Sequence, residues 1–335
     1  PNPRVGCVIV NAGEIVGKGF HRKAGEAHAE INALKMAGPR ARNATAYVTL
    51  EPCNHSGRTP PCSEKLLAAG ISRVIYATDD VNTEVAGHGS ALLRDNGIGV
   101  SSGLMRAQAR LLNRGFFMRH EQGRPFVTVK VAMTLDAKIG LKSGESKWIT
   151  GPEARTDVQR LRAQSCAIVT GKGTVRSDDP RLSVRDESLQ TLGRQPLAVV
   201  LDSSLSLGTD YRIFDKSATC IIMHCVESTN ANYNVRVQKV SQDAGKIDLE
   251  DALSHLAKLE CNEVLVEAGP TLSSAFIVAG LWDELVVYMA PKLIGESGRD
   301  GFALPEVSEL SEAKDVKLSE VRYVGRDIRL TFTRG

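Results

Sequence analysis

The stretch from Leu50 to Cys62, LEPCNHSGRTPPC, places two cysteines around a short polar loop, and GEAHAE at residues 25–30 supplies a histidine and a glutamate upstream. Zinc binds imidazole nitrogen and thiolate sulfur, and a catalytic zinc site keeps its fourth position open for water. His28, Cys53 and Cys62 would provide three such ligands. Glu30 would lie beside the activated water as a proton shuttle that passes a proton to a departing amine. The two stretches therefore predict a catalytic zinc site.

The order of these residues resembles the signature of zinc deaminases of nucleobases, which is H-x-E followed by P-C-x-x-C. His28-Ala29-Glu30 precedes Pro52-Cys53, but eight residues instead of two separate Cys53 from Cys62. Two other interpretations stay open. In one, a partly exposed histidine lies near two structural thiols. In the other, His55 closes a structural zinc site as a fourth ligand, which leaves Glu30 without a role.

Composition places the chain among ordinary globular proteins with a real core. It has 335 residues, 42% hydrophobic and 24% charged, and this length predicts two domains. The formal net charge is only +3, which argues against broad electrostatic binding of nucleic acid or a membrane surface. We therefore expect that a few local residues hold any anionic group of a substrate.

Cysteine usage favours a reducing compartment. The chain has seven cysteines, an odd and low number for this length, so a disulfide framework is not expected. No stretch approaches the length of a transmembrane span, and no charged-then-apolar leader precedes Pro1. The prediction is a cytoplasmic protein without a membrane partner. Because the sequence opens abruptly on PNPRVGCVIV, we expect native residues before Pro1.

Strands and helices alternate along the first third of the chain, which indicates a layered α/β domain over residues 1–122. The expected strands are 4–10, 15–20, 44–50, 72–78 and 98–103, and the expected helices are 28–37, 62–70, 89–97 and 106–120. Pro61 before the second helix and Gly70 after it are typical helix boundaries. The polar segment 121–125, with Gly123 and Pro125, is the predicted domain boundary.

A second α/β series follows over residues 123–335. The expected strands are 126–136, 166–171, 196–202, 218–225, 235–240, 263–269, 283–291 and 327–333, and the expected helices are 153–164, 248–259 and 271–280. Thr150 and Glu153 form a capping-box signature before the first of these helices. No G-x-G-x-x-G follows a strand, so a Rossmann fold is not supported. Glu267-Ala268-Gly269-Pro270-Thr271 instead ends a strand and begins a helix whose free amides can bind phosphate, although a plain tight turn is the alternative.

Motifs along nearly the whole chain resemble the family of bifunctional riboflavin-biosynthesis deaminase/reductases, in which the longer cysteine spacing is typical. The motifs are PNPRVGCVIV, HAEINAL, YVTLEPCNHSGRTPPC, VAGHG, KVAMTLDAKIG, SKWITG, RAQSCAIVTGKGTVRSDDPRLSVR and VEAGPTLSSAFI. The resemblance implies a cytidine-deaminase-like α/β/α N-terminal domain and a dihydrofolate-reductase-like α/β C-terminal domain. It also implies hydrolytic deamination of 2,5-diamino-6-(5-phosphoribosylamino)pyrimidin-4(3H)-one, followed by NADPH-dependent reduction of the ribosyl group to ribityl.

The family's deaminase residues carry over by motif position. His28, Cys53 and Cys62 would hold zinc, and Glu30 would transfer protons. Three further residues would contact the phosphorylated pyrimidine substrate: Asn2, His55 and Arg58. Asn2 could instead only shape its turn, and the other two could belong to a solvated loop.

The reductase residues also follow from the resemblance. The substrate positions are Ser146, Arg162, Leu182, Arg185 and Glu267, and the cofactor positions are Ala132, Trp148, Thr174, Asp178, Ser203, Gly269, Pro270, Thr271, Leu272, Ser273, Ser274 and Ala275. Asp178 is the candidate proton-handling carboxylate, with Lys130 as a weaker polar partner, although Asp178 could merely cap the turn before Pro180. Without the family, Arg162 would be interpreted as an exposed helix charge and Trp148 as core.

The chain departs from the family pattern at two places that remove no named ligand. Ala137 replaces the usual glycine after Leu-Asp, and Asp80-Val81-Asn82-Thr83 replaces a more common Asp-Pro-Asn-Pro.

We expect a homo-oligomer, either dimer or tetramer. A deaminase of nucleic-acid bases and a closed zinc clip that holds an interaction domain are the competing functions. The near-neutral charge and the aromatic content of 5% disfavour nucleic acid as a partner.

Overall fold

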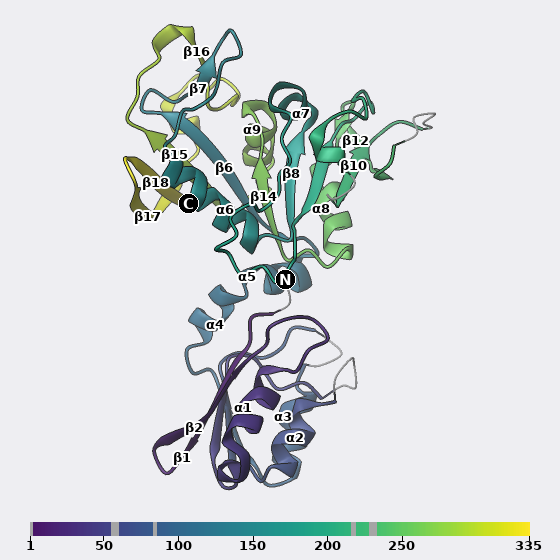
Figure 1. Ribbon diagram of the computed structural model, residues 1–335, viewed down its shortest axis with the longest axis vertical. Coiled ribbons are helices and arrows are strands. Elements are labelled where there is room, and N and C mark those ends of the chain that lie inside the picture. The colour runs from purple at the N-terminus through teal and green to yellow at the C-terminus, as the bar shows by residue number, and fades with distance from the viewer. Residues whose placement is uncertain (1–2, 55–59, 83–85, 216–218, 228–232) are drawn as a thin grey trace. The chain divides into compact units, whose positions relative to one another are not determined.

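The computed structural model divides into two compact units, Pro1–Gly123 and Arg124–Gly335 (Figure 1). The structure describes residues 3–54, 60–82, 86–215, 219–227 and 233–335. Asn2, His55 and Arg58, the three predicted deaminase substrate contacts, lie outside the described residues, as does Thr83. Across the described part of the chain, every helix is too short or too polar to cross a membrane.

The first unit is built on a five-stranded sheet in the order β2-β1-β3-β4-β5. β1 pairs antiparallel with both β2 and β3, whereas β3, β4 and β5 run parallel. The strands are β1 Gly6–Asn11, β2 Glu14–Phe20, β3 Thr45–Val48, β4 Arg73–Tyr76 and β5 Gly99–Ser102. The helices are α1 Ala29–Ala37, α2 Cys62–Ala68, α3 His88–Asp95, α4 Arg106–Leu112 and α5 Arg114–Gln122, with a 3₁₀ turn η1 at Gly38–Ala41.

Helices α1, α2 and α3 lie together along the sheet of this unit (Figure 1). Their apolar side chains form one core with the inward-facing residues of the strands, including Ile9, Leu66 and Leu93. Alternation along β3 produces this arrangement, because Ala46 and Val48 point into the core while Tyr47 between them is exposed.

Two glycines of β2 allow α1 to pack closely on the sheet. A Cβ at Gly17 would lie 2.3 Å from the carbonyl oxygen of Ala33, and one at Gly19 would lie 2.2 Å from that of Ala29. Only glycine tolerates such an approach of strand and helix backbone. The close packing fixes the beginning of α1, which directly follows His28.

The second unit contains a nine-stranded sheet in the order β11-β10-β9-β8-β14-β6-β15-β18-β17. The strands from β11 to β15 are parallel, and β18 and β17 extend the sheet as an antiparallel hairpin. The strands of this sheet are β6 Phe126–Thr134, β8 Ala167–Gly171, β9 Leu197–Leu201, β10 Cys220–His224, β11 Arg236–Lys239, β14 Glu263–Glu267, β15 Glu284–Ala290, β17 Val316–Val324 and β18 Asp327–Arg334. Two small ribbons pair β7 Lys138–Leu141 with β16 Gly298–Asp300, and β12 Gln242–Asp243 with β13 Lys246–Ile247.

Helices cover both faces of this large sheet. α8 Leu249–Lys258 and α9 Pro270–Val278 contribute to one core, whereas α6 Pro152–Gln164 and α7 Lys172–Asp178 contribute to the other. Three 3₁₀ turns complete the unit: η2 Arg212–Phe214, η3 Gly295–Ser297 and η4 Leu310–Glu312. Because the parallel strands point the same way, their carboxyl ends meet at one edge, which is where open α/β sheets bind ligands.

Several expected elements differ from the structure. The capping box is wrong: α6 has Gly151 as its N-cap without a side-chain cap, and the Gly151 N–H donates to the Asp327 carboxylate at 2.6 Å. The single helix expected over 106–120 is two helices that meet at Asn113. Asn113 exchanges two hydrogen bonds with the backbone of Arg4, so a tertiary contact fixes the break.

Candidate metal centre and reductase site

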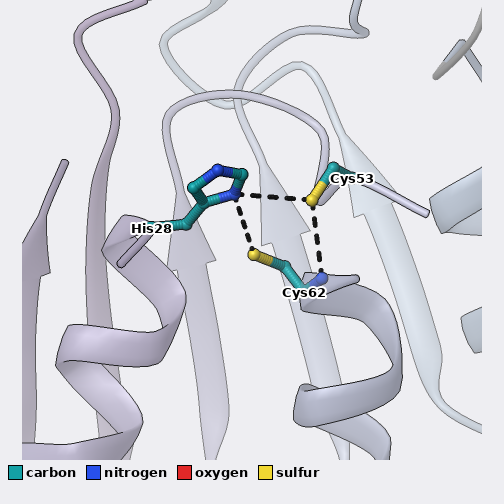
Figure 2. Close-up of side chains that lie close together, drawn as sticks. All are labelled: His28, Cys53 and Cys62. Carbon is teal, nitrogen blue, oxygen red and sulfur yellow. Dashed lines mark hydrogen bonds between the residues drawn. The ribbon is translucent and has the colours of Figure 1, made fainter. Parts of the chain in front are cut away.

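Three side chains from separate elements converge at one end of the first unit (Figure 2). The Nδ1 atom of His28 lies 3.3 Å from Cys62 Sγ and 3.5 Å from Cys53 Sγ. His28 is the N-cap of α1, Cys53 follows β3, and Cys62 is the first residue of α2. The structure thus brings together the three ligands that the sequence analysis selected, and their donor atoms all lie within 4.8 Å of one another.

This donor set fits zinc. With Zn–N bonds of about 2.0 Å and Zn–S bonds of about 2.3 Å, tetrahedral geometry places nitrogen and sulfur about 3.5 Å apart. The observed distances of 3.3 and 3.5 Å require little movement. One imidazole and two thiols leave one tetrahedral position for water. His55, the alternative fourth ligand, lies outside the described residues.

Local contacts hold the two cysteines at this spacing. The backbone N–H of Cys62 donates to Cys53 Sγ at 3.5 Å, and the N–H of Ser63 donates to the carbonyl of Cys53 at 3.2 Å. The buried hydroxyl of Ser63 donates to Asn54 Oδ1 at 2.7 Å. The first two residues of α2 therefore hold Cys53 and Asn54 in position.

The charges at the centre suit a metal ligand and a proton carrier. The pKa of the Cys53 thiol is lowered to about 4, chiefly because it accepts a hydrogen bond from Cys62, with His28 adding to the effect. The thiolate is the form that binds zinc. Glu30 is buried beside these groups, and burial raises the pKa of its carboxyl to about 7. A carboxyl poised near neutrality is suited to general acid–base work.

Comparisons with known proteins agree with both units. Residues 1–78 match the family model described as the cytidine and deoxycytidylate deaminase zinc-binding region, and residues 125–330 match the RibD C-terminal domain. The riboflavin biosynthesis protein RibD of Escherichia coli (strain K12) is 47% identical over 340 residues, covering 98% of this chain and 93% of that protein. The chain belongs to the RibD family. The RibD protein of Haemophilus influenzae is 44% identical, covering 99% of this chain and 92% of that protein.

Solved structures of RibD proteins share the fold over the whole chain. Acinetobacter baumannii RibD, form 1, superposes with a TM-score of 0.93 at 42% identity and covers 100% of this chain and 93% of that one. A Thermotoga maritima diaminohydroxyphosphoribosylaminopyrimidine deaminase/5-amino-6-(5-phosphoribosylamino)uracil reductase has a TM-score of 0.88 at 34% identity, with the same coverage. The predicted fold class is confirmed: a cytidine-deaminase-like unit precedes a RibD reductase domain.

In the second unit of this RibD-family chain, four charged residues gather around the carboxyl end of β14. Glu267 binds Arg162 through two hydrogen bonds, at 2.6 Å to Nε and 2.9 Å to Nη2, and both side chains are largely buried. Lys130 on β6 pairs with Glu267 in the sheet register. Arg185 also acts electrostatically on Glu267. The structure thus brings Arg162, Arg185 and Glu267 together, and Arg162 is not an exposed helix charge.

Burial and charge shift the pKa values of this group. Burial lowers the pKa of Lys130, although Glu267 opposes the effect. Burial alone would raise the pKa of Glu267, but Arg162 and Lys130 hold it below its usual range. Asp178, at the end of α7, also interacts with Lys130. The charge of Asp178 therefore acts on Lys130 and opposes the effect of burial on its pKa.

The predicted cofactor positions follow the carboxyl edge of the sheet. Gly269 is the N-cap of α9, and its N–H donates to the hydroxyl of Thr174 on α7 at 3.2 Å. Ser203, which follows β9, accepts a hydrogen bond from the N–H of Cys225 at 3.0 Å. The side chains of Ser273 and Ser274 are buried and bonded within the protein, to Ala268 O and Ala303 N. The hydroxyls of these two serines are therefore engaged within the protein.

Two other predicted contacts have contrasting environments. Trp148 is 63% exposed instead of core, and the Arg155 guanidinium lies 4.3 Å from the centre of its ring. Leu182 is 3% exposed and packs in a core cluster. Ser146 is half-buried, two residues before Trp148. Asp179, next to Asp178, organises the turn before Pro180 by accepting the N–H of Arg212 at 2.7 Å.

Sequence reasoning missed two cations beside Ser203. The Lys172 ammonium donates to Ser204 Oγ at 3.0 Å, and Arg176 Nη2 donates to Ser206 Oγ at 3.0 Å. Both cations belong to α7 and reach the loop after β9. The first of these cations lies in Gly171-Lys172-Gly173, which is too short to count as a G-x-G-x-x-G cofactor signature.

Proposed function

We propose that the chain catalyses two steps of riboflavin biosynthesis. Residues 1–123 would hydrolyse an amino group from 2,5-diamino-6-(5-phosphoribosylamino)pyrimidin-4(3H)-one. Residues 124–335 would then reduce the ribosyl group with NADPH to give 5-amino-6-(5-phosphoribitylamino)uracil. The convergence of His28, Cys53 and Cys62 beside a buried Glu30 carries the proposal. The name of the Thermotoga maritima protein, which states both activities, supports it.

In the deaminase unit, His28, Cys53 and Cys62 would hold zinc. When bound, zinc activates a water molecule for attack near neutral pH. Glu30 accepts the proton on a carboxylate oxygen and returns it to the departing amino group as ammonia forms. Burial suits this role, because the raised pKa lets the carboxyl both accept and release a proton near neutrality. Asn2, His55 and Arg58 remain the proposed substrate contacts.

In the reductase unit, the residues at the carboxyl edge of the sheet would hold NADPH, which supplies a hydride when bound. Gly269–Ala275 remains the proposed phosphate contact, and within it the amides of Thr271 and Leu272, in the first turn of α9, lack a partner inside the helix and suit the phosphates. Ala132, Trp148, Thr174 and Ser203 complete the proposed contacts. Lys172 and Arg176 lie next to Ser203. Lys172 also pairs with the buried Asp202 at 3.3 Å, but the two cations outnumber that carboxylate and would favour the additional phosphate of NADPH over NADH.

The substrate side of the reductase is the cluster around Glu267. The Arg162 guanidinium is already held by Glu267, so the exposed Arg185 is the better cation for the substrate phosphate. Ser146 and Leu182 are the other proposed contacts. Asp178 remains the proposed proton-handling carboxylate, and the lowered pKa of Lys130 suits it to hand on a proton.

Metal removal tests the first activity. The zinc-loaded protein should release ammonia from the diaminopyrimidine phosphate in the absence of NADPH, and a chelator should abolish that release. Adding zinc back should restore it. Ammonia release that persists in metal-free protein would contradict the proposed deaminase.

The competing functions have their own tests. A deaminase of nucleic-acid bases should shift single-stranded RNA in a gel at physiological salt, and the net charge of +3 predicts no such shift. A closed zinc clip should give a cobalt-substituted spectrum without a water ligand. The proposal predicts a spectrum with one exchangeable ligand.

We propose a homo-oligomer in the cytoplasm. Strand β17 forms one edge of the large sheet, and Val321 and Tyr323 on it are 56% and 78% exposed. An exposed apolar edge strand is a surface that a second copy can cover. Light scattering after size-exclusion chromatography measures the mass, and a monomer would contradict this part of the proposal. Seven free thiols support a reducing compartment.

A further inference from the structure

Glu51 is a buried carboxylate that the proposed mechanism does not use. It lies two residues before Cys53, and its side chain accepts backbone hydrogen bonds from a segment far along the chain. The N–H of Gly87 donates to Oε2 at 3.1 Å, and the N–H of Ser90 donates to Oε1 at 3.1 Å. The N–H of Asp80 lies 3.4 Å from Oε2.

These bonds make Glu51 the cap of α3. Gly87 is the N-cap of this helix and Ser90 belongs to its first turn, and α3 has no side-chain cap of its own. The first amides of a helix lack partners within the helix, and negative charge is favourable at this end. A carboxylate on the segment that leads from β3 to Cys53 therefore supplies what α3 lacks.

The same contact reaches the ligand turn. A Cβ at Gly89 would lie 1.8 Å from the carbonyl oxygen of Pro52 and 3.7 Å from the carbonyl carbon of Cys53. The first turn of α3 thus lies directly on the Pro52-Cys53 peptide, and only glycine fits there. The Glu51 N–H also donates to the carbonyl of Thr78 at 3.0 Å, which ties the turn to the segment after β4.

We infer that Glu51 is a positioning residue of the metal centre. By holding the beginning of α3 against the Pro52-Cys53 turn, it fixes the backbone from which the Cys53 thiolate reaches the metal. The role rests on the proposed zinc-dependent deaminase. Groups that orient metal ligands without touching the metal matter strongly, and their loss typically reduces affinity or activity.

The first test compares Glu51→Gln with Glu14→Gln, which makes the same change at an exposed position of the β1–β2 hairpin. Each carboxylate oxygen of Glu51 accepts a backbone N–H, but glutamine has only one oxygen and presents an NH₂ group in place of the other. The substitution therefore breaks one of these hydrogen bonds without a change in side-chain size. We expect Glu51→Gln to bind zinc about 10- to 100-fold more weakly in competition with a chromophoric chelator, and Glu14→Gln to bind like the wild type. Cobalt-loaded Glu51→Gln should also show a changed thiolate charge-transfer spectrum.

The reductase of the same chain is an internal control for folding, since its activity should persist in Glu51→Gln. Zinc affinity and cobalt spectrum equal to the wild type would overturn the positioning role, because a merely structural residue moves neither once the protein is folded. A wild-type chain that binds no zinc would instead overturn the proposed deaminase and the inference with it.

A second measurement needs no variant and so does not depend on how Glu51→Gln folds. Amide hydrogen exchange of the wild-type chain is followed with zinc bound and after its removal. If α3 and the Pro52-Cys53 turn form one unit, residues 86–93 should lose protection together with the amides of Glu51, Cys53 and Asn54. Loss of protection at those three amides with none in 86–93 would overturn the inference.

Discussion

At the scale of single residues, the proposed deaminase depends on how Glu30 is buried beside its neighbours. The carboxyl is 3% exposed, and burial raises its pKa to about 7.

Ligand types and their order along the chain were sufficient to select His28, Cys53 and Cys62, because few residue types bind zinc. The role of Glu51 could not be predicted in the same way, because it depends on where α3 arrives in space.

Replacing Glu30 by glutamine should lower deaminase kcat/KM by about 10²- to 10⁴-fold, the usual contribution of a general acid–base. The zinc content and the NADPH-dependent reduction of Glu30→Gln should stay at wild-type levels. The control Glu14→Gln should keep wild-type deamination, zinc content and reduction. Ammonia release and metal analysis measure the outcome. Wild-type deamination by zinc-loaded Glu30→Gln would show that another group moves the proton.

Ala137 offers a test of stability at one residue. It has φ of 58°, a left-handed conformation in which an L-residue costs about 1 kcal/mol or more. Ala137→Gly should therefore raise the unfolding free energy of the reductase unit by about 0.5–1 kcal/mol in urea denaturation. The comparison Ala107→Gly, at an exposed position of α4 in the first unit, should instead lower the unfolding free energy of that unit by up to about 1 kcal/mol. A destabilising Ala137→Gly would contradict the backbone argument.

At the scale of elements, short connections after parallel strands build the reductase site. α7 follows β8. Lys172 at its beginning contacts the loop after β9, and Thr174 contacts the beginning of α9. Its sequence, KGTVRSD, has poor helix propensity, which is why the sequence analysis did not predict it. Tertiary contacts stabilise this helix in the folded protein, so its position and the two cations that it carries could not be predicted from the sequence.

Replacing Lys172 by alanine should raise the KM for NADPH about tenfold and change that for NADH much less, since a charged hydrogen bond to phosphate is lost. Lys246→Ala, at an exposed position of β13, should leave both values unchanged. Steady-state reduction with each cofactor measures the effect. Equal changes for NADPH and NADH would place the additional phosphate elsewhere.

A second element-level test uses the buried Asp157, which joins α6 to three strands. It accepts hydrogen bonds from Tyr288 at 2.6 Å, Arg322 at 2.9 Å and Arg329 at 3.1 Å. Burial alone would raise its pKa, but these partners lower it below the usual 3.8. A lowered pKa contributes stability that is fully present above the unfolded value and is lost as the pH falls through the folded value.

Asp157→Asn should therefore destabilise the reductase unit at pH 7 by about 3 kcal/mol, since two arginines lose their partner. The difference from the wild type should begin to shrink below about pH 4, where the aspartate of the unfolded chain becomes protonated, and should be lost once the pH falls below the lowered native pKa. Urea unfolding at a series of pH values checks the sign. A difference that grows on acidification would contradict the account.

At the scale of the whole molecule, the chain combines two compact α/β units, each with its own core and its own cluster of chemical groups. Strand–helix alternation along the sequence was sufficient to predict both series, because buried parallel strands are apolar over their whole length. β17 was missed because nearly all of its residues are exposed, which leaves no burial pattern to read. Its place at the sheet edge follows from pairing with β18.

The most direct measurement of the central claim is a product analysis. The zinc-loaded protein is supplied with the diaminopyrimidine phosphate, with and without NADPH, and the products are identified by mass. Without NADPH, the account predicts a product in which one amino group has become an oxygen. With NADPH, that product should gain two hydrogens. An unchanged substrate, or a reduced product that keeps both amino groups, would contradict the claim that deamination and then reduction take place on this chain.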